Sequence, residues 1–373
     1  MDNSISDKTL QKKPLSTFRA RSNSVWILFK ENLSLGVVLV FLVALPFFVA
    51  LLTGQSVTGL LVNEASTSRF VQGLAIEIFL LAVYAISYDL ILGITGLLSF
   101  GHAMFFAVGA YLMGIMLKSF GWGFFPILGL IVVAGIVQAL LFGIVLPRVQ
   151  GITFALVTLG MASVFYIVIQ SRELGDFTGA DVGLQGVIAP AFLNPVSQRL
   201  RFYFITLAFM FLVYLVYRRF VNSPTGRVCI ALRENEGRAQ MLGYNTFYFK
   251  LVALVISSVT AALAGALYTL HQPIVTPHVA SLAFTVTALL IILIGGMGTL
   301  SGAIIGAVVF RLLDFGLSRR FPESSSFITG AIYIAIVLFV PYGIVGTWKL
   351  KSFRIKQGRD RLARLLGGRS ELK

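Results

Sequence analysis

The chain has 373 residues, of which 57% are hydrophobic and only 12% are charged. Soluble domains carry roughly twice that charged fraction, so the composition excludes an ordinary soluble protein. The net charge of +15 does not indicate nucleic-acid binding, because the basic residues gather in segments that flank apolar stretches. The single cysteine, Cys229, excludes an intramolecular disulfide framework. No metal site is predicted, since the cysteine and the three histidines show no metal-ligand spacing.

Apolar segments of about 20 residues recur along the chain, and each can cross a bilayer core of about 30 Å. They predict an all-α polytopic membrane protein with about ten transmembrane helices, because open strands cannot satisfy their backbone groups in lipid. The predicted spans are about 34–52, 71–92, 103–117, 124–146, 152–170, 202–217, 251–270, 281–294, one from Gly302 to about Leu317, and 327–346.

Ten spans place both termini on one side of the membrane, and the positive charges identify that side as the cytoplasm. With the N-terminus inside, 22 of the 30 Lys and Arg residues fall in cytoplasmic segments and seven in external ones. The predicted organisation is a basic cytoplasmic N-terminal arm (1–33), a membrane domain (34–346) and a basic cytoplasmic tail (347–373). The first helix is expected to remain uncleaved, because no small-residue cleavage site closes the first apolar run.

The longest internal polar segment runs from Asn222 to Lys250, between two predicted spans. Glu234, Glu236 and Arg238 favour one short water-facing helix within it. Its acidic residues lie toward its start and Arg238 toward its end, the order that the helix dipole favours. Two interpretations are open: a solvated connector, or a rigid lever that docks on another protein and transmits its movement into the membrane.

Two glycine-rich breaks interrupt the predicted spans and share the pattern G-x-x-G-x-L-S, at 93–99 and 295–301. The shared pattern indicates either a parallel repeat, a known feature of transporters, or a chance match. Irregular backbone at membrane depth is tolerated where protein or a water-filled path covers it. The alternative is close helix packing through small residues. The predicted residues of a translocation path are the two breaks and two carboxylates: Glu77, Asp89, Gly93, Gly96, Ser99, Gly101, His102, Gly295, Gly296 and Gly298.

Four charged residues lie within or at the ends of predicted spans: Glu77, Asp89, Arg311 and Asp314. Intramembrane charges are costly and are either functional or paired. Arg311 and Asp314 are three residues apart on one predicted helix, so they could simply neutralise each other. For Glu77 and Asp89 the functional and the paired interpretation both remain open.

No catalytic constellation is present: the chain contains no GxSxG, HExxH or paired-cysteine motif. It also contains no Walker A sequence GxxxxGK[ST], so it is predicted to be a non-enzyme without its own ATPase site.

Four stretches nevertheless resemble the LivM-type permeases of branched-chain amino acid ABC importers. They are YAISYDLILGITGLLSFGHAMFFAVGAY (84–111), TGADVGLQG (178–186), SPTGRVCIALRENEGRAQMLGYNTFYFKLVALVISSVTAALAGALY (223–268) and IGGMGTLSGAIIGAVVF (294–310). They follow the family's order and together cover most of Tyr84 to Phe310.

The resemblance implies a multi-pass subunit of the plasma (bacterial inner) membrane that pairs with a LivH-type permease. Two cytoplasmic ATPase subunits would hydrolyse ATP, an extracytoplasmic binding protein would deliver the solute, and this chain would bind no cofactor. Glu236-x-x-Ala239-x-x-x-Gly243 is similar to the EAA loop that seats in an ATPase groove. The implied coupling residues within 222–250 are Arg233, Glu234, Glu236, Arg238, Ala239 and Gly243. The implied outer loop or gate contains Thr178, Gly179, Asp181, Gly183 and Leu184.

Departures from the family pattern leave the solute open. Asp89 stands where the family commonly has Asn, and Ala180 and Val182 interrupt its TGG-x-DGL loop. Urea-importer permeases often carry Asp at this position, so urea or a short amide is an alternative to branched-chain or other neutral amino acids. Two other classes are an ion-coupled secondary transporter that uses Glu77 or Asp89 and a non-transporting membrane scaffold.

Overall fold

The computed structural model describes residues 21–54, 66–272 and 274–348. The described part is all-helical, as predicted, and its one strand-like pairing is an isolated bridge between Leu184 and Val275. The long helices are α1 (Arg21–Leu52), α3 (Ser66–Asp89), α4 (His102–Lys118), α5 (Phe124–Val145), α6 (Ile152–Gln170), α8 (Arg199–Asn222), α11 (Thr246–His271), α12 (Leu282–Gly295), α13 (Leu300–Arg320) and α14 (Ser325–Phe339). The short ones are η1 (Leu90–Ile94), η2 (Arg172–Leu174), α7 (Gly175–Thr178), η3 (Ala180–Val182), η4 (Ala191–Leu193), α9 (Pro224–Glu234), α10 (Glu236–Met241) and η5 (Pro277–Ala280).

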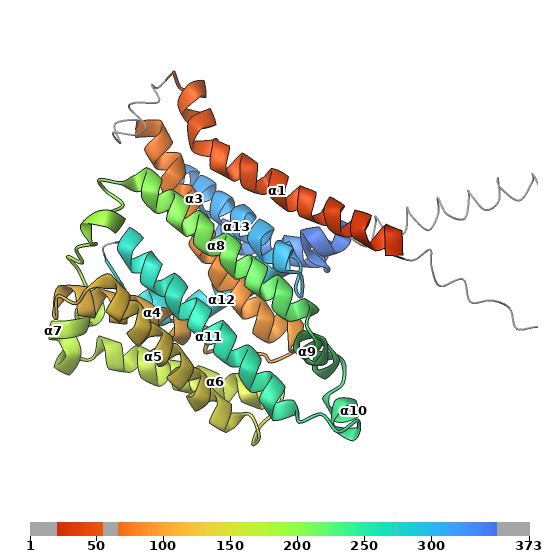
Figure 1. Cartoon of the computed structure of the whole chain (residues 1–373). Coiled ribbons are helices and arrows are strands. Elements are labelled where there is room, and N and C mark those ends of the chain that lie inside the picture. The colour runs from red at the N-terminus through yellow and green to blue at the C-terminus, as the bar shows by residue number, and fades with distance from the viewer. Residues whose placement is uncertain (1–20, 55–65, 273, 349–373) are drawn as a thin grey trace, which may run out of the picture.

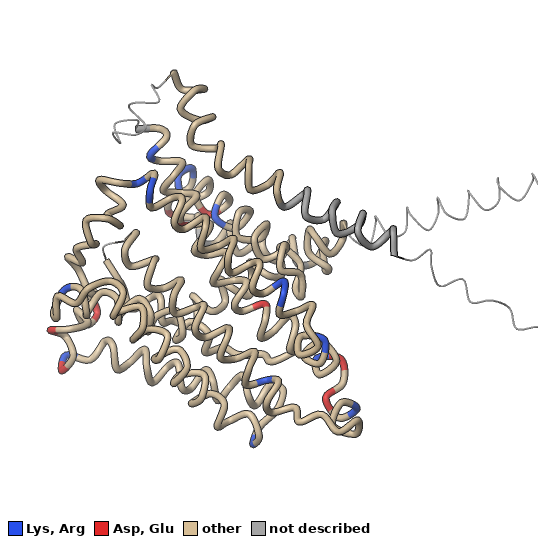
Figure 2. Tube along the Cα trace, in the orientation of Figure 1, with Lys and Arg blue, Asp and Glu red and all other residues tan. Residues whose placement is uncertain are grey.

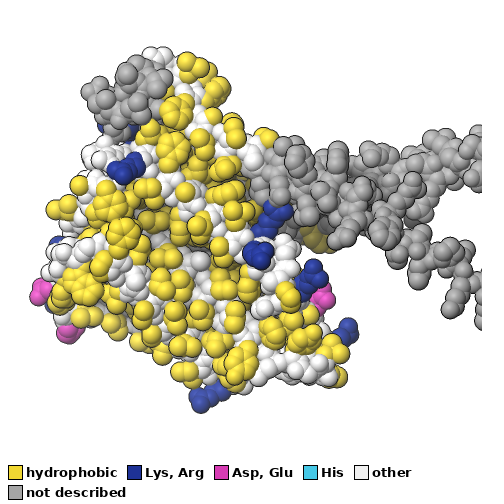
Figure 3. Space-filling view, viewed as in Figure 1, with side chains coloured by type: hydrophobic (Ala, Val, Ile, Leu, Met, Phe, Trp, Pro, Cys, Tyr) yellow, Lys and Arg dark blue, Asp and Glu magenta, His cyan; other side chains and the backbone are white. Residues whose placement is uncertain are grey.

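A helix lies in each of the ten predicted apolar segments. The last one, α14, ends at Phe339 rather than at the predicted Gly346, because Pro341 cannot continue the helix. In the described part, six helices are long and apolar enough to cross a membrane: α3 with η1, α5, α6, α8, α11 and α13. Shorter apolar helices occur within α1, α4, α12 and α14. Charged residues lie mostly at the two ends of the bundle (Figure 2), and hydrophobic side chains cover most of the visible face between them (Figure 3). The chain is a multi-pass helical membrane protein.

Two helices form the centre of the bundle. α3 packs against α8, α11, α12 and α13, while α11 packs against α3, α4 and α5. The most apolar window of the span that contains α3 is 78% buried, whereas the corresponding window of α13 is only 22% buried. α3 is therefore surrounded by protein, and α13 is left with a broad face for lipid or a partner chain.

The contact between α4 and α11 is a backbone-to-backbone approach. A Cβ atom built on Gly109 would lie 1.8 Å from the carbonyl oxygen of Ala262, and one on Gly265 would lie 2.0 Å from that of Phe106. Because both glycines lack a side chain, the hydroxyl of Thr269 on α11 can donate to the Ala110 carbonyl on α4 at 2.9 Å. For Gly109, the structure favours close packing through small residues.

The polar connections lie at opposite ends of the bundle. In Figure 1, α9 and α10 lie at the same end as the start of α1, and α7 lies at the other end. α1 begins at Arg21, well before the predicted span boundary at Ser34, so residues 21–33 of the predicted arm are helical. The apolar part of this helix runs from Gly36 to Leu52, close to the predicted span, because hydropathy marks only the apolar part of a helix. Residues 1–20 of the arm and 349–373 of the tail lie outside the described residues.

Candidate functional site

The first glycine-rich break follows α3 directly. The helix changes to a π-helical turn at Leu90–Ile94, and an irregular segment then leads to α4. π-turns inside helices frequently occur at functional sites. The irregular segment is held by polar contacts: the Tyr88 hydroxyl donates to the Ser99 carbonyl at 2.9 Å. His102 is fully buried, and its Nε2 lies 2.9 Å from the Ser87 hydroxyl.

The second break, between α12 and α13, touches the first. The backbone N–H of Gly298 donates to Asp89 Oδ1 at 2.7 Å. A Cβ atom on Gly93 would lie 2.0 Å from that carboxylate oxygen and 2.5 Å from the Gly298 nitrogen. Gly298 has φ +77°, in the left-handed region that favours glycine. The predicted path residues Asp89, Gly93 and Gly298 are therefore in direct contact.

Arg233, a predicted coupling residue at the end of α9, completes this arrangement. Its Nη1 donates to the carbonyl oxygen of Gly93. Its backbone also lies against the first break, since a Cβ on Gly96 would be 3.0 Å from the Arg233 Cα. Asp89 is 1% exposed, its Oδ2 has no hydrogen-bond partner, and the charge of Arg233 acts on it electrostatically. We name Asp89, Gly93, Arg233 and Gly298 the Asp89–Arg233 junction.

The segment 222–250 forms two helices rather than the single predicted one. α9 ends at Glu234, and Asn235 adopts an extended conformation whose side-chain oxygen accepts from the Arg238 N–H at 2.9 Å. Asparagine is a preferred N-cap, so it ends one helix and starts the next. Of the predicted coupling residues, Arg233, Glu234, Arg238 and Gly243 are exposed, while Ala239 is buried.

α10 is fixed to the bundle by one ion pair and presents an apolar tip. Lys250 Nζ lies 2.5 Å from Glu236 Oε1, and the Lys250 side chain is only 8% exposed. The tip consists of Met241 and Leu242, which are 87% and 73% exposed. Met241 ends α10 and Leu242 follows it, so the sequence shows two adjacent large apolar residues in this polar segment but not that both are exposed.

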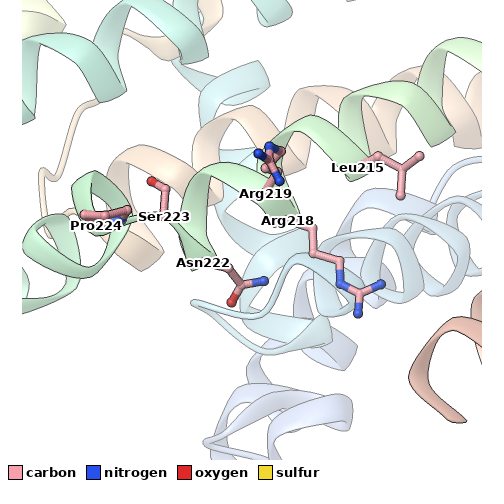
Figure 4. Close-up of a pocket in the computed structure, with 6 residues that line it drawn as sticks. All are labelled: Leu215, Arg218, Arg219, Asn222, Ser223 and Pro224. Carbon is pink, nitrogen blue, oxygen red and sulfur yellow. The ribbon is translucent and has the colours of Figure 1, made fainter. Parts of the chain in front are cut away.

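A pocket of about 450 Å³ lies at the corner where α8 leads into α9 (Figure 4). Arg218, Arg219 and Asn222 from the end of α8 line it, together with Ser223 and Pro224. The Ser223 hydroxyl caps α9 by accepting from the Gly226 N–H at 3.2 Å. Paired arginines at the end of a span fit the predicted cytoplasmic side.

The predicted outer loop packs against the break between α11 and α12. Leu184 and Val275 exchange two backbone hydrogen bonds, of 3.0 and 2.9 Å. Gly183 is confined by this contact, because a Cβ there would lie 2.4 Å from the Val275 carbonyl oxygen. Thr178 and Leu184 are buried, whereas Asp181 and Val182 are exposed. Thus only part of the predicted loop can contact another molecule.

Ala180, one departure from the family's loop pattern, has a backbone conformation that is unfavourable for alanine. It has φ +46° and is the only described non-glycine residue with positive φ. This region costs an L-residue about 1–2 kcal/mol, which glycine avoids. We expect Ala180→Gly to raise the thermal midpoint and to stabilise the fold by about 1 kcal/mol. Thermal unfolding in detergent would measure this, with Ala191→Gly in a neighbouring turn as the control; equal shifts for both variants would contradict the expectation.

The charges inside the bundle form a chain across three helices. Arg311 on α13 pairs with Glu77 on α3 through Nε at 2.5 Å and with Asp314 through Nη1 at 2.7 Å. Gln272 at the end of α11 donates to Glu77 Oε1 at 2.9 Å. The expected Arg311–Asp314 pair is present. The sequence could not show, however, that Glu77 on another helix pairs with the same arginine.

The described part is thus a bundle of helices, six of them long and apolar enough to cross a membrane, in which Arg233 at the end of the polar helix α9 donates to the Gly93 carbonyl in the first break. The family described as "Branched-chain amino acid transport system / permease component" matches residues 70–337, and the chain belongs to this family. Both breaks, α9, α10 and the outer loop lie within the matched region.

Individual relatives agree with the family match. The LivM permease of Salmonella typhimurium is 27% identical over 88% of this chain and 78% of its own length. The LivM permease of Escherichia coli K12 is 26% identical over 85% of this chain and 75% of its own length. The LivH permease of the same Escherichia coli strain is 26% identical over 71% of this chain and 91% of its own. No solved structure matches the chain.

Proposed function

We propose that this chain is a permease subunit of an ABC importer that carries branched-chain amino acids inward. The observation that carries the proposal is the family match over residues 70–337, which includes both breaks and both extramembrane helices. The similarity to both LivM and LivH relatives supports pairing with a second, LivH-like permease. Two ATPase subunits on other chains would supply the energy, and an extracytoplasmic binding protein would deliver the solute. The location would be the bacterial inner membrane, with no cofactor bound by this chain.

The decisive experiment isolates the tagged chain from its own membranes in mild detergent and assays ATP hydrolysis in the eluate. We expect ATPase subunits to copurify and their rate to rise with binding protein loaded with leucine or valine. If only binding protein loaded with urea stimulates ATP hydrolysis, the transported solute is a short amide and not an amino acid. An ATPase-free eluate that takes up solute down an ion gradient would overturn the proposal in favour of ion-coupled transport.

The proposed topology has ten spans with both termini in the cytoplasm. Val182, shortly after α7, and Met241, the last residue of α10, are 66% and 87% exposed. Because α7 and α10 lie at opposite ends of the bundle (Figure 1), cysteines at these positions are better probes than one at the buried Thr178. In intact cells, an impermeant maleimide should label Val182→Cys, and Met241→Cys only after permeabilisation. The native Cys229 should stay unlabelled, because it is fully buried and burial raises the pKa of its thiol. The reverse labelling pattern would show that both termini lie outside the cytoplasm.

Coupling would pass from the ATPases through α10 into the bundle. We expect Glu236→Lys to lower leucine-stimulated ATP hydrolysis about tenfold, since an unpaired, nearly buried Lys250 costs about 3 kcal/mol and detaches α10 from α11. The exchange Glu236→Lys with Lys250→Glu restores the pair and should recover most of the stimulation. Full activity of Glu236→Lys would show that the pair does not position α10. Failure of the exchange would instead assign Glu236 a direct contact with the ATPase.

A further inference from the structure

A cavity of about 300 Å³ is lined by residues of α3, α11, α12 and α13, including Gln272 just after α11 and Phe284 near the start of α12. Its polar lining includes Glu77, Gln272, Arg311 and Asp314. The Glu77, Arg311 and Asp314 side chains are 16%, 25% and 41% exposed, so all three reach the cavity surface. The volume is at the lower limit of small-molecule sites.

The cavity also has an apolar wall. Leu81, Phe284 and Phe310 line it, and Phe284 is 7% exposed overall. A ligand that fits must therefore carry charge at one end and an aliphatic or aromatic group at the other. A purely ionic solute would make no favourable contact with this apolar wall, and a purely apolar solute would leave the charged side chains without a polar partner.

The arrangement of the charged side chains further specifies the polar end of the ligand. The cluster holds two carboxylates and one guanidinium. Two histidines lie close to it: His271, whose Nε2 is 3.8 Å from Glu77, and His278, which lines the cavity. Glu77 is bonded to both Arg311 and Gln272, whereas the more exposed Asp314 side chain is bonded to Arg311. The Arg311–Asp314 pair is thus the one that a ligand can enter.

A zwitterion can enter that pair without leaving a charge unpaired. Its carboxylate replaces Asp314 at the Arg311 guanidinium, and its ammonium takes Asp314 as a new partner. Neutral urea offers no such exchange, and a fatty acid leaves Asp314 without a cation, which is costly inside a membrane protein.

We infer that this cavity is a transient site for an α-amino acid with an aliphatic side chain, held between Arg311 and Asp314 with its side chain against Leu81, Phe284 and Phe310. The inference rests on the proposed function and adds a binding site within the membrane to it. The cavity lies beside the loop that follows α11, which the Leu184–Val275 bridge joins to the proposed outer loop. The site is therefore placed to receive solute from that side.

The test uses the complete transporter in proteoliposomes with saturating binding protein, and a diazirine analogue of leucine as the probe. Light during ATP turnover should label the peptides that contain Phe284 or Phe310, and excess leucine should abolish the label. Asp314→Asn and Arg311→Gln should each lower labelling and leucine import per ATP hydrolysed by about tenfold, the value of one charged contact. The control Arg319→Gln, at the exposed end of the same helix, should leave both unchanged.

The outcomes separate the two proposals. If the transporter imports leucine but the probe labels other peptides and not those with Phe284 or Phe310, the cavity site is overturned and the proposed function stands. Wild-type rates in Asp314→Asn have the same meaning, and this exposed position reduces the risk of misfolding in that variant. If the complete transporter does not import leucine but imports another solute, the proposed function itself fails, and with it the site for aliphatic amino acids.

Discussion

Replacing Arg233 by glutamine should lower ATP-driven leucine import at least tenfold while the ATPase subunits remain bound. The Arg233 guanidinium connects α9 to the Gly93 carbonyl and is the cation that acts on the buried Asp89. A hydrogen bond to a charged group is worth about 1.5–3 kcal/mol, which corresponds to roughly a 10- to 100-fold change in a conformational equilibrium. Without it, movement of α9 would no longer shift the two glycine breaks.

The measurement is leucine uptake and ATP hydrolysis by the same reconstituted complex. Arg233→Lys keeps the charge but not the planar donor set, so an intermediate rate is expected. Arg227→Gln is the matched control, because it removes an exposed arginine from the start of the same helix. Normal import by Arg233→Gln would show that the junction is not part of coupling, and loss of bound ATPase would indicate a docking role instead.

Gly109→Leu should prevent stable folding, with a loss of more than about 4 kcal/mol. Its Cβ alone would lie 1.8 Å from the Ala262 carbonyl oxygen, so α4 and α11 would have to separate along the most extensive helix contact of the described bundle. Large losses of this kind follow from overpacking against backbone that has no room to shift.

Size-exclusion chromatography and thermal unfolding of the purified chain would check this expectation. Gly160→Ala is the control, since a Cβ there meets nothing within 4 Å and alanine favours a helix by about 1 kcal/mol over glycine. The control should keep or raise the thermal midpoint. A Gly109→Leu protein with an unchanged midpoint would mean that α4 and α11 do not approach so closely.

The ten apolar segments were predictable because hydropathy is a local property of roughly 20 residues. The same is true of the glycine breaks and of the polar segment 222–250, whose residue types exclude a continuous apolar helix. Helix ends were less predictable. α1 extends upstream into polar residues, and Asn235 divides the predicted cytoplasmic helix in two because its side chain caps α10.

The sequence by itself determined that this protein is a helical membrane permease, that its breaks lie near positions 93–101 and 295–298, and which residue types face water. Only the tertiary structure decided which distant residues meet. Asp89 meets Gly298 across 209 positions, Glu77 meets Arg311 across 234, and Arg233 reaches Gly93 across 140. Such pairings depend on how helices cross, and crossing geometry is set by the close approach of small residues on different helices, which no single segment encodes.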